Sequence, residues 1–154
     1  SDPEPYAALS RTYAKLGDYA NSVSFGQQAI NYNPTDPYLY GNLGVVYYRM
    51  GDYPRAIKML AIAVQGGTAE TGETVEGLAL DYWPVSEYYY MYGLALARQG
   101  RCGEALPIAQ AVAEGVSLEE FSVSNAQEIV NICQQVADGD LEMTEPAETE
   151  TPQP

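Results

Sequence analysis

Residues 37–68, PYLYGNLGVVYYRMGDYPRAIKMLAIAVQGGT, decide the fold because their pattern occurs three times in the chain. Residues 3–34, PEPYAALSRTYAKLGDYANSVSFGQQAINYNP, match them at an offset of 34 positions, and both copies contain Gly-Asp-Tyr near their centre. The third copy, residues 86–117, follows at an offset of 49, which is 15 more than the period and marks an insertion. A fixed period of this length indicates a repeat architecture.

The ends of the expected helices carry the residues that start and stop helices. Asp2-Pro3 and Asp36-Pro37 offer an N-cap carboxylate followed by proline at the first helical position. Gly17, Gly51 and Gly100 suit the left-handed conformation that ends a helix. The pattern predicts helices near 3–16, 19–32, 37–50, 53–65, 86–99 and 102–114, and a seventh within about 122–138, with Ser124 as its N-cap and Gly139 as its stop.

Two apolar helical stripes separated by a Gly-Asp-Tyr turn, repeated every 34 residues, resemble the tetratricopeptide repeat. Small residues occupy the positions that need them, namely Gly44, Gly93, Ala56, Ala105, Ala29 and Ala63. Large residues occupy the others, including Tyr40, Leu43, Tyr47 and Leu60. The departures are Ser10, Ser22, Gly26, Cys102 and Pro107. The resemblance implies an all-α, right-handed superhelical solenoid of antiparallel helix pairs, in which the seventh helix caps the last repeat.

The chain divides into one repeat domain and an acidic tail. We expect the repeat domain over residues 1–138, with repeats at about 3–36, 37–68 and 86–119 and the capping helix at about 122–138. Residues 139–154 combine proline, threonine and glutamate with little to bury, which is typical of a disordered tail or linker.

The insertion at 66–84 lacks sustained helical periodicity. Two readings stay open for it: a short hairpin that turns at 70–73, or an irregular loop with one helical turn near 75–80. In either case we expect Trp83 and Leu78 to pack against the second and third repeats.

Composition excludes several functional classes. A formal net charge of −14, from 21 acids and 7 bases, argues against nucleic acid and against anionic membranes. No uninterrupted apolar run is long enough to cross a bilayer. The absence of histidine removes Ser/His/Asp and Cys/His catalysis, and two cysteines leave no zinc site of ordinary composition. We therefore expect no enzyme, no cofactor and no metal.

The repeat register brings Cys102 and Cys133 to one edge of the stack, because equivalent turns of stacked repeats lie alongside each other. Two readings stay open: a disulfide, or two buried free thiols that act as small apolar residues. A disulfide would favour an oxidising, extracytoplasmic compartment, and free thiols would favour the cytoplasm.

The resemblance also implies a concave groove, lined by the first helix of each repeat, that holds an extended peptide or a helix of a partner. A helical wheel of residues 86–99 places Tyr89 and Tyr92 in the core, Tyr88 on the flank that faces the insertion, and Tyr90 in the groove. The same register in the other repeats completes the candidate site, which is Arg11, Lys15, Tyr38, Asn42, Val45, Tyr48, Arg49, Tyr90, Met91, Leu94 and Arg98. Tyrosines suit this role because they combine a large contact area with a hydroxyl group.

Lys15, Arg49 and Arg98 recur at one repeat position. Each also lies in the last turn of its helix, where a cation meets the helix dipole favourably, so a structural reading competes with a basic strip for an acidic peptide. In some family members a clamp of lysine, asparagine and further bases holds a C-terminal carboxylate, and the resemblance places Ala7, Arg11, Asn42, Glu87 and Met91 at its positions. Only Asn42 matches, so the sequence does not support the chaperone type of clamp.

These features predict a protein–protein interaction or scaffold module whose partner is a protein or peptide. The alternative is a structural spacer or self-association domain of a larger protein, with a membrane-anchored protein as one candidate.

Overall fold

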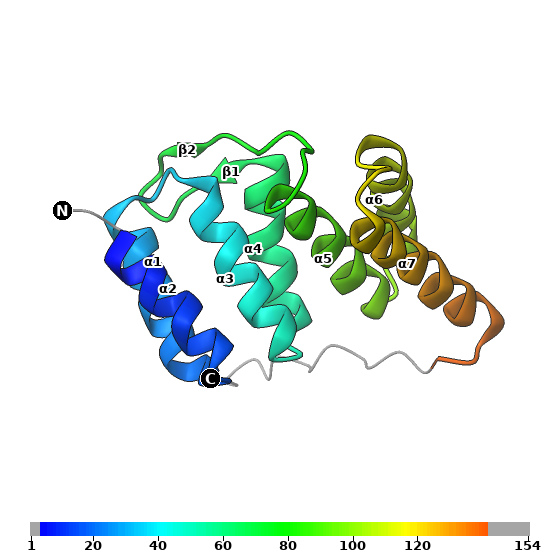
Figure 1. Ribbon diagram of the computed structural model, residues 1–154, viewed down its shortest axis with the longest axis horizontal. Helices are drawn as coiled ribbons and strands as arrows, with labels where there is room; N and C mark the ends of the chain where they lie inside the picture. Colours follow the sequence, from blue (N-terminus) through cyan, green and yellow to red (C-terminus); the bar gives the residue numbers. More distant parts are fainter. Residues whose placement is uncertain (1–3, 142–154) are drawn as a thin grey trace, which may run out of the picture.

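The computed structural model describes residues 4–141, and the part of the predicted tail from 142 to 154 lies outside the described residues. The described chain contains seven α-helices and one two-stranded hairpin (Figure 1). Their bounds are α1 Glu4–Lys15, α2 Tyr19–Tyr32, α3 Pro37–Arg49, α4 Tyr53–Gln65, β1 Gly67–Thr68, β2 Thr74–Val75, α5 Val85–Arg98, α6 Cys102–Gly115 and α7 Glu120–Asp138. Each predicted helix is present, and α7 begins before the predicted cap at Ser124.

The helices stack in the order of the sequence. The pairs α1–α2, α3–α4 and α5–α6 each form a helical hairpin, α2 packs on α3, α4 packs on α5, and α7 covers α5 and α6. Figure 1 shows these helices following one another across the molecule from α1 to α7. The all-α solenoid predicted from the repeat is confirmed, and each repeat mainly contacts its neighbours.

The turn between the two helices of a repeat has the same construction each time. Gly17, Gly51 and Gly100 adopt φ of +77°, +78° and +71°, a region that only glycine enters without strain. In the first two repeats the next residue caps the second helix: Asp18 accepts from the backbone N–H of Asn21, and Asp52 from that of Arg55, both at 3.2 Å. The Gly-Asp-Tyr signature is therefore a helix stop followed by a helix start.

The small residues of the repeat let neighbouring helices approach closely. A Cβ atom at Gly44 would lie 2.5 Å from the Leu60 side chain of α4, and one at Gly93 would lie 2.5 Å from the Ile129 side chain of α7. Both distances are far below van der Waals contact, so a larger residue would force the helices apart. The second contact shows that α7 packs on α5 in a close, repeat-like manner.

The first repeat departs from the pattern at Ser10 and Ser22, and the two departures compensate each other. The Ser10 hydroxyl donates to the backbone oxygen of Ser22 at 2.7 Å, and the Ser22 hydroxyl donates to the backbone oxygen of Ser10 at 2.8 Å. Both side chains are buried. A reciprocal pair of this kind satisfies the hydroxyl groups that burial would otherwise penalise.

The insertion forms a hairpin, so the first of the two readings is correct. β1 and β2 pair antiparallel with Gly67 opposite Val75, and Ala69 and Val75 are buried beneath the turn. The backbone N–H of Leu78 then donates to the carbonyl of Ala63 in α4 at 2.8 Å, which fixes the end of the hairpin to the second repeat. Leu78 packs as expected, but the same expectation for Trp83 is wrong, because its side chain is 69% exposed.

Helix α5 is covered on more sides than a helical wheel assumes, because it contacts α3, α4, α6 and α7. Tyr88 is buried against α3, whereas Tyr89 is half-buried and its hydroxyl donates to the Leu78 carbonyl of the insertion at 2.5 Å. These two residues exchange the roles that the sequence suggested. Tyr92 is buried in the core, as predicted.

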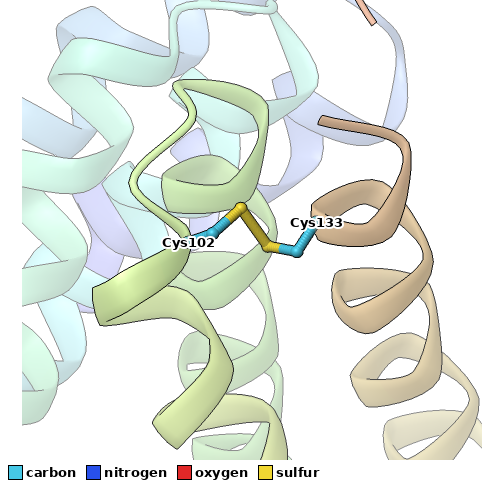
Figure 2. Close-up of a disulfide and its surroundings, with 2 residues drawn as sticks. All are labelled: Cys102 and Cys133. Carbon is cyan, nitrogen blue, oxygen red and sulfur yellow. A yellow bond between two sulfur atoms is a disulfide. The ribbon is translucent and has the colours of Figure 1, made fainter. Parts of the chain in front are cut away.

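Cys102 and Cys133 form a disulfide that joins the start of α6 to α7 (Figure 2). Their Cα atoms are 5.7 Å apart, which lies within the range that a disulfide requires. Of the two readings of the cysteine pair, the structure therefore shows the disulfide. The link ties the capping helix to the last repeat, with a sequence separation of 31 residues.

Candidate functional site

A hollow of about 170 Å³ lies on the face formed by the first helices of the three repeats, α1, α3 and α5. We call it the first-helix hollow, and it is lined by Ser10, Arg11, Ala14, Lys15, Asn42, Val45, Val46, Arg49, Trp83, Pro84, Glu87 and Tyr88. Five of the eleven candidate site residues line it, namely Arg11, Lys15, Asn42, Val45 and Arg49. Residues from two separate repeats thus converge on one surface.

The middle of this hollow is held by a hydrogen bond between two repeats. The Tyr88 hydroxyl donates to the side-chain oxygen of Asn42 at 2.7 Å. Burial raises the pKa of Tyr88, and the nearby Glu87 carboxylate adds to this effect, so the hydroxyl remains a neutral donor. Because the Asn42 oxygen is occupied, the side-chain nitrogen of this residue is oriented as a donor.

Gly41 makes the position of Tyr88 possible. A Cβ atom at Gly41 would lie 2.7 Å from three carbons of the Tyr88 ring, so any side chain there would displace the tyrosine. The ring of Tyr38 meets that of Tyr88 edge-on, with a centroid separation of 6.3 Å. Tyr38, a candidate site residue, is exposed and lies at the border of the hollow.

Glu87 balances part of the positive charge in the hollow. One of its oxygens lies 3.5 Å from the Arg49 guanidinium, and the other accepts from the indole N–H of Trp83 at 3.0 Å. Arg11 pairs with Glu4 at 2.8 Å. Lys15 has no carboxylate within 4.0 Å among residues 4–141, so it is the cation of the hollow that is most available to a ligand.

Tyr48 and Arg98 form a separate cluster beyond the hollow. The Arg98 Nε donates to the Tyr48 hydroxyl at 3.0 Å, which is the main cause of a raised pKa at Arg98. The Tyr48 ring lies 5.4 Å from that of Tyr53, and the Arg98 guanidinium lies 5.9 Å above the same Tyr53 ring. Lys15, Arg49 and Arg98 therefore share a repeat position but differ in their surroundings.

Tyr90 and Leu94 are not on an open surface, which corrects their assignment to the groove. Tyr90 is 3% exposed and Leu94 is equally buried. The Tyr90 ring packs edge-on against Phe121 of α7, with centroids 5.9 Å apart. The physical reason is that α7 packs against α5 on the side that the wheel left to solvent. Met91 beside them is half-buried, and Val45 is buried in the wall of the hollow.

Seven residues that line the hollow are not among the candidate site residues, namely Ser10, Ala14, Val46, Trp83, Pro84, Glu87 and Tyr88. The sequence signal for Tyr88 is Gly41 itself, since a glycine in a helix interior usually has a packing reason. Here the reason is the close approach of the Tyr88 ring. No local signal marks Trp83 as exposed, because a lone tryptophan in an insertion more commonly packs.

A second and larger hollow, of about 490 Å³, lies on another side of the molecule. We call it the hairpin hollow, because α2, α4 and the tip of the β1–β2 hairpin enclose it. It is lined by Gln27, Ile30, Asn31, Pro34, Tyr40, Lys58, Met59, Ile62, Thr68, Ala69, Glu70 and Thr71. Lys58 and Glu70 are its charged residues, and it contains none of the candidate site residues.

Two further properties hold for the part of the chain that the structure describes. None of the helices between residues 4 and 141 is long and apolar enough to cross a membrane. The same residues contain no group of three or more histidine, cysteine, aspartate or glutamate side chains suited to a metal ion.

Comparison with protein families identifies the repeats. A model described as "TPR repeat" matches residues 11–51, and one described as "Tetratricopeptide repeat" matches residues 38–66. No curated protein sequence matches the chain.

Several solved structures have a similar fold. The first TPR of Spaghetti (RPAP3), bound to the HSP90 peptide SRMEEVD, is 19% identical with a TM-score of 0.67, covering 88% of this chain and 94% of that one. The TPR2B domain of yeast Sti1, in a pHsp70 complex, is 19% identical with a TM-score of 0.60, covering 89% and 97%. The MamA protein is 17% identical with a TM-score of 0.52, covering 93% and 79%. Residues 11–66 therefore match models of the tetratricopeptide repeat, and the fold of the chain is similar to that of these TPR domains.

Proposed function

We propose that this chain is a protein-interaction module that holds a segment of a partner protein in the first-helix hollow. The observation that carries the proposal is the convergence of Lys15, Asn42 and Arg49 with the aromatic residues Trp83 and Tyr88 in one hollow. A few placed polar groups among apolar and aromatic side chains are what a peptide-binding surface requires.

The similar structures support this reading through their fold. RPAP3 and Sti1 contain repeat domains of similar fold, and their structures were solved with an HSP90 peptide and as a pHsp70 complex, respectively. In this chain Ala7, Glu87 and Met91 occupy positions where a carboxylate clamp needs basic residues. The negative charge of Glu87 opposes a peptide terminus of that kind, so we expect a partner with different chemistry.

Each residue of the hollow has a role in this proposal. The Asn42 amide nitrogen donates to a backbone carbonyl of the bound segment, and Tyr88 keeps this amide in place. Lys15 attracts an acidic side chain of the segment, since no carboxylate of the described chain neutralises it. The exposed Trp83 ring supplies apolar contact area with few torsions to freeze. We assign no catalytic role to these groups, since the hollow contains no pairing of a nucleophile with a base.

The domain organisation of the proposal follows the sequence. Residues 1–138 would act as the interaction domain, and residues 139–154 as a linker or tail. The partner is a protein or peptide, and its identity is left to experiment.

The proposal is tested by affinity capture from a native extract with matched charge reversals. Lys15→Glu and Asn42→Ala alter the first-helix hollow. Lys58→Glu is the control for Lys15→Glu, because it makes the same charge reversal in the hairpin hollow. We expect the first two variants to lower the yield of captured partners about tenfold, equivalent to about 1.4 kcal/mol, and Lys58→Glu to leave it unchanged.

Two results would contradict the proposal. One is an equal loss of partners with Lys58→Glu, because that would indicate a general electrostatic effect. The other is full retention of partners by both variants of the first-helix hollow. If light scattering instead shows dimers that Asn42→Ala abolishes, the hollow serves self-association.

A further inference from the structure

Four large apolar side chains project at the end of the molecule where α5 and α7 begin. Tyr82 and Trp83 precede α5, while Leu118 and Phe121 flank the start of α7. Leu118 and Phe121 are 84% and 70% exposed, and the other two side chains are also exposed. We call these four residues the aromatic edge. Single exposed apolar residues are common, but several on adjoining segments mark an interaction surface.

Hydrogen bonds make the two segments of the aromatic edge one surface. The Glu119 carboxylate accepts from the Ser122 hydroxyl at 2.6 Å and from the backbone N–H of Trp83 at 2.9 Å. Leu118 and Phe121 lie within two residues of Glu119 in sequence, so the bond from Trp83 to Glu119 brings the two segments side by side. The surface is therefore fixed before any partner binds, which lowers the entropic cost of binding.

The aromatic edge is surrounded by negative charge. Residues 81–87 and 118–121 contain Asp81, Glu87, Glu119 and Glu120 and no lysine or arginine. Hydrogen bonds, led by the one from Ser122, lower the pKa of Glu119, so this carboxylate stays charged. Arg49 pairs with Glu87 at 3.5 Å on the side of the first-helix hollow, so Asp81, Glu119 and Glu120 carry most of the negative charge of the edge. The chain contains no base after Arg101, so the α7 side cannot neutralise the edge.

This charge limits what can cover the edge. A second copy of the chain, with a net charge of −14, would bring like charges together. An anionic membrane would be repelled for the same reason. A protein segment with basic residues is attracted, and its apolar residues remove the exposed rings from water.

We propose that the aromatic edge docks a partner segment in which a large apolar side chain is flanked by lysine or arginine. The inference rests on the proposed function, because Trp83 and Glu87 also line the first-helix hollow. One segment would thus pass from the hollow onto the edge.

The test is selection from a random peptide library displayed on phage. The baits are the wild type, Leu118→Ser/Phe121→Ser at the edge, and Lys15→Glu/Asn42→Ala in the hollow. Leu16→Ser serves as the matched control, because Leu16 is 74% exposed in the α1–α2 turn and is not part of the aromatic edge. Circular dichroism melting checks that each variant is folded.

We expect the wild type to enrich peptides with an aromatic or aliphatic residue next to lysine or arginine. The edge variant should capture these peptides at least tenfold less, and Leu16→Ser should capture them equally well. A synthetic consensus peptide without tryptophan should shift the emission of Trp83, the only tryptophan of the chain, to shorter wavelength. This binding should weaken as salt is added, since charges contribute to it.

The outcomes separate the two proposals. If the hollow variant loses the peptides and the edge variant keeps them, the aromatic edge proposal falls and the proposed function stands. If both variants keep the peptides, both proposals fall. Enriched peptides without basic residues, or no enrichment above the edge variant, overturn the inference. The inference is also overturned if Leu118 and Phe121 are needed for dimer formation, or for binding to vesicles of neutral lipid, and not for peptide capture.

Discussion

The first-helix hollow and the hairpin hollow differ in volume and in chemistry, and only the chemistry favours the smaller one as a binding site. The hairpin hollow, at about 490 Å³, is almost three times as large as the first-helix hollow, at about 170 Å³. The larger one is lined mostly by aliphatic and amide side chains, whereas the smaller one contains three cations, a carboxylate, a tryptophan and a tyrosine. Recognition of a specific segment depends on convergent polar and aromatic groups more than on space. The comparison therefore favours the smaller hollow.

The two hollows also differ in their place along the stack of repeats. Removal of the disulfide tests whether a change in the last repeat reaches the hairpin hollow, and it has the largest expected effect on stability. Cys102→Ala/Cys133→Ala should lower the free energy of unfolding by about 3 kcal/mol, because the unfolded chain gains freedom across the opened loop. Denaturation in urea measures the loss.

In a solenoid the loosening should remain local to the last repeat and its cap. Hydrogen exchange should increase in α6 and α7 and change little in α2 and α4, which line the hairpin hollow. An equal increase throughout the chain would contradict the local picture. Alkylation of both cysteines in unreduced native protein would show that they are free thiols and would contradict the disulfide.

The second prediction disturbs the base of the β1–β2 hairpin, whose tip lines the hairpin hollow. A Cβ atom at Gly77 would lie 2.6 Å from the backbone of both Gln65 and Gly66, so Gly77→Ala must displace the base of the hairpin. We expect a loss of about 1–3 kcal/mol in stability with unchanged peptide binding.

Gly67→Ala is the matched control, because its Cβ would only meet the Ile62 side chain at an ordinary 3.5 Å. Peptide binding by all three proteins is compared by Trp83 fluorescence. Loss of binding with Gly77→Ala but not with Gly67→Ala would assign recognition to the hairpin hollow.

The third prediction concerns the hydrogen bond that holds the middle of the first-helix hollow. Tyr88→Phe removes the donor to Asn42, and Tyr89→Phe removes the donor to the Leu78 carbonyl. Each should cost about 1 kcal/mol in stability. Only Tyr88→Phe should weaken peptide binding, since it frees the Asn42 amide to turn. Equal binding by both variants would show that Asn42 takes no part.

The smallest expected effect is the pH dependence contributed by Glu119 at the aromatic edge. The folded state lowers the pKa of Glu119, so its contribution to stability is present above the unfolded pKa of about 4.3 and is lost as the pH falls through the folded value. Between about pH 5 and pH 3 the wild type should therefore lose more stability than Glu119→Gln. Thermal melts across this range measure the difference. Parallel curves for the two proteins would contradict the role of Glu119.

The sequence predicts the architecture of this chain well because the same pattern of apolar and turn residues recurs in each repeat. Helix bounds and turns follow from the 34-residue register, which also makes Cys102 and Cys133 neighbours, whereas the structure decides that they form a disulfide. Arg11, Lys15, Asn42 and Arg49 were placed in the groove by the same register, and they do lie together, although their binding role remains a prediction.

The sequence fails where packing depends on a neighbour outside the repeat. Tyr90 is buried because α7 covers α5, and a helical wheel of one element contains no information on that contact. Trp83 is exposed because the insertion is fixed through Leu78 and Glu119, which leaves its ring outside. Both errors come from tertiary contacts that override local pattern.

The most direct test of the central claim is to map where a selected peptide binds. A peptide that carries a photoreactive benzophenone side chain is cross-linked to the wild type, and the modified residues are found by mass spectrometry. The proposed function predicts cross-links in residues 42–49 and 83–91. Cross-links confined to residues 58–71, in the hairpin hollow, would contradict it.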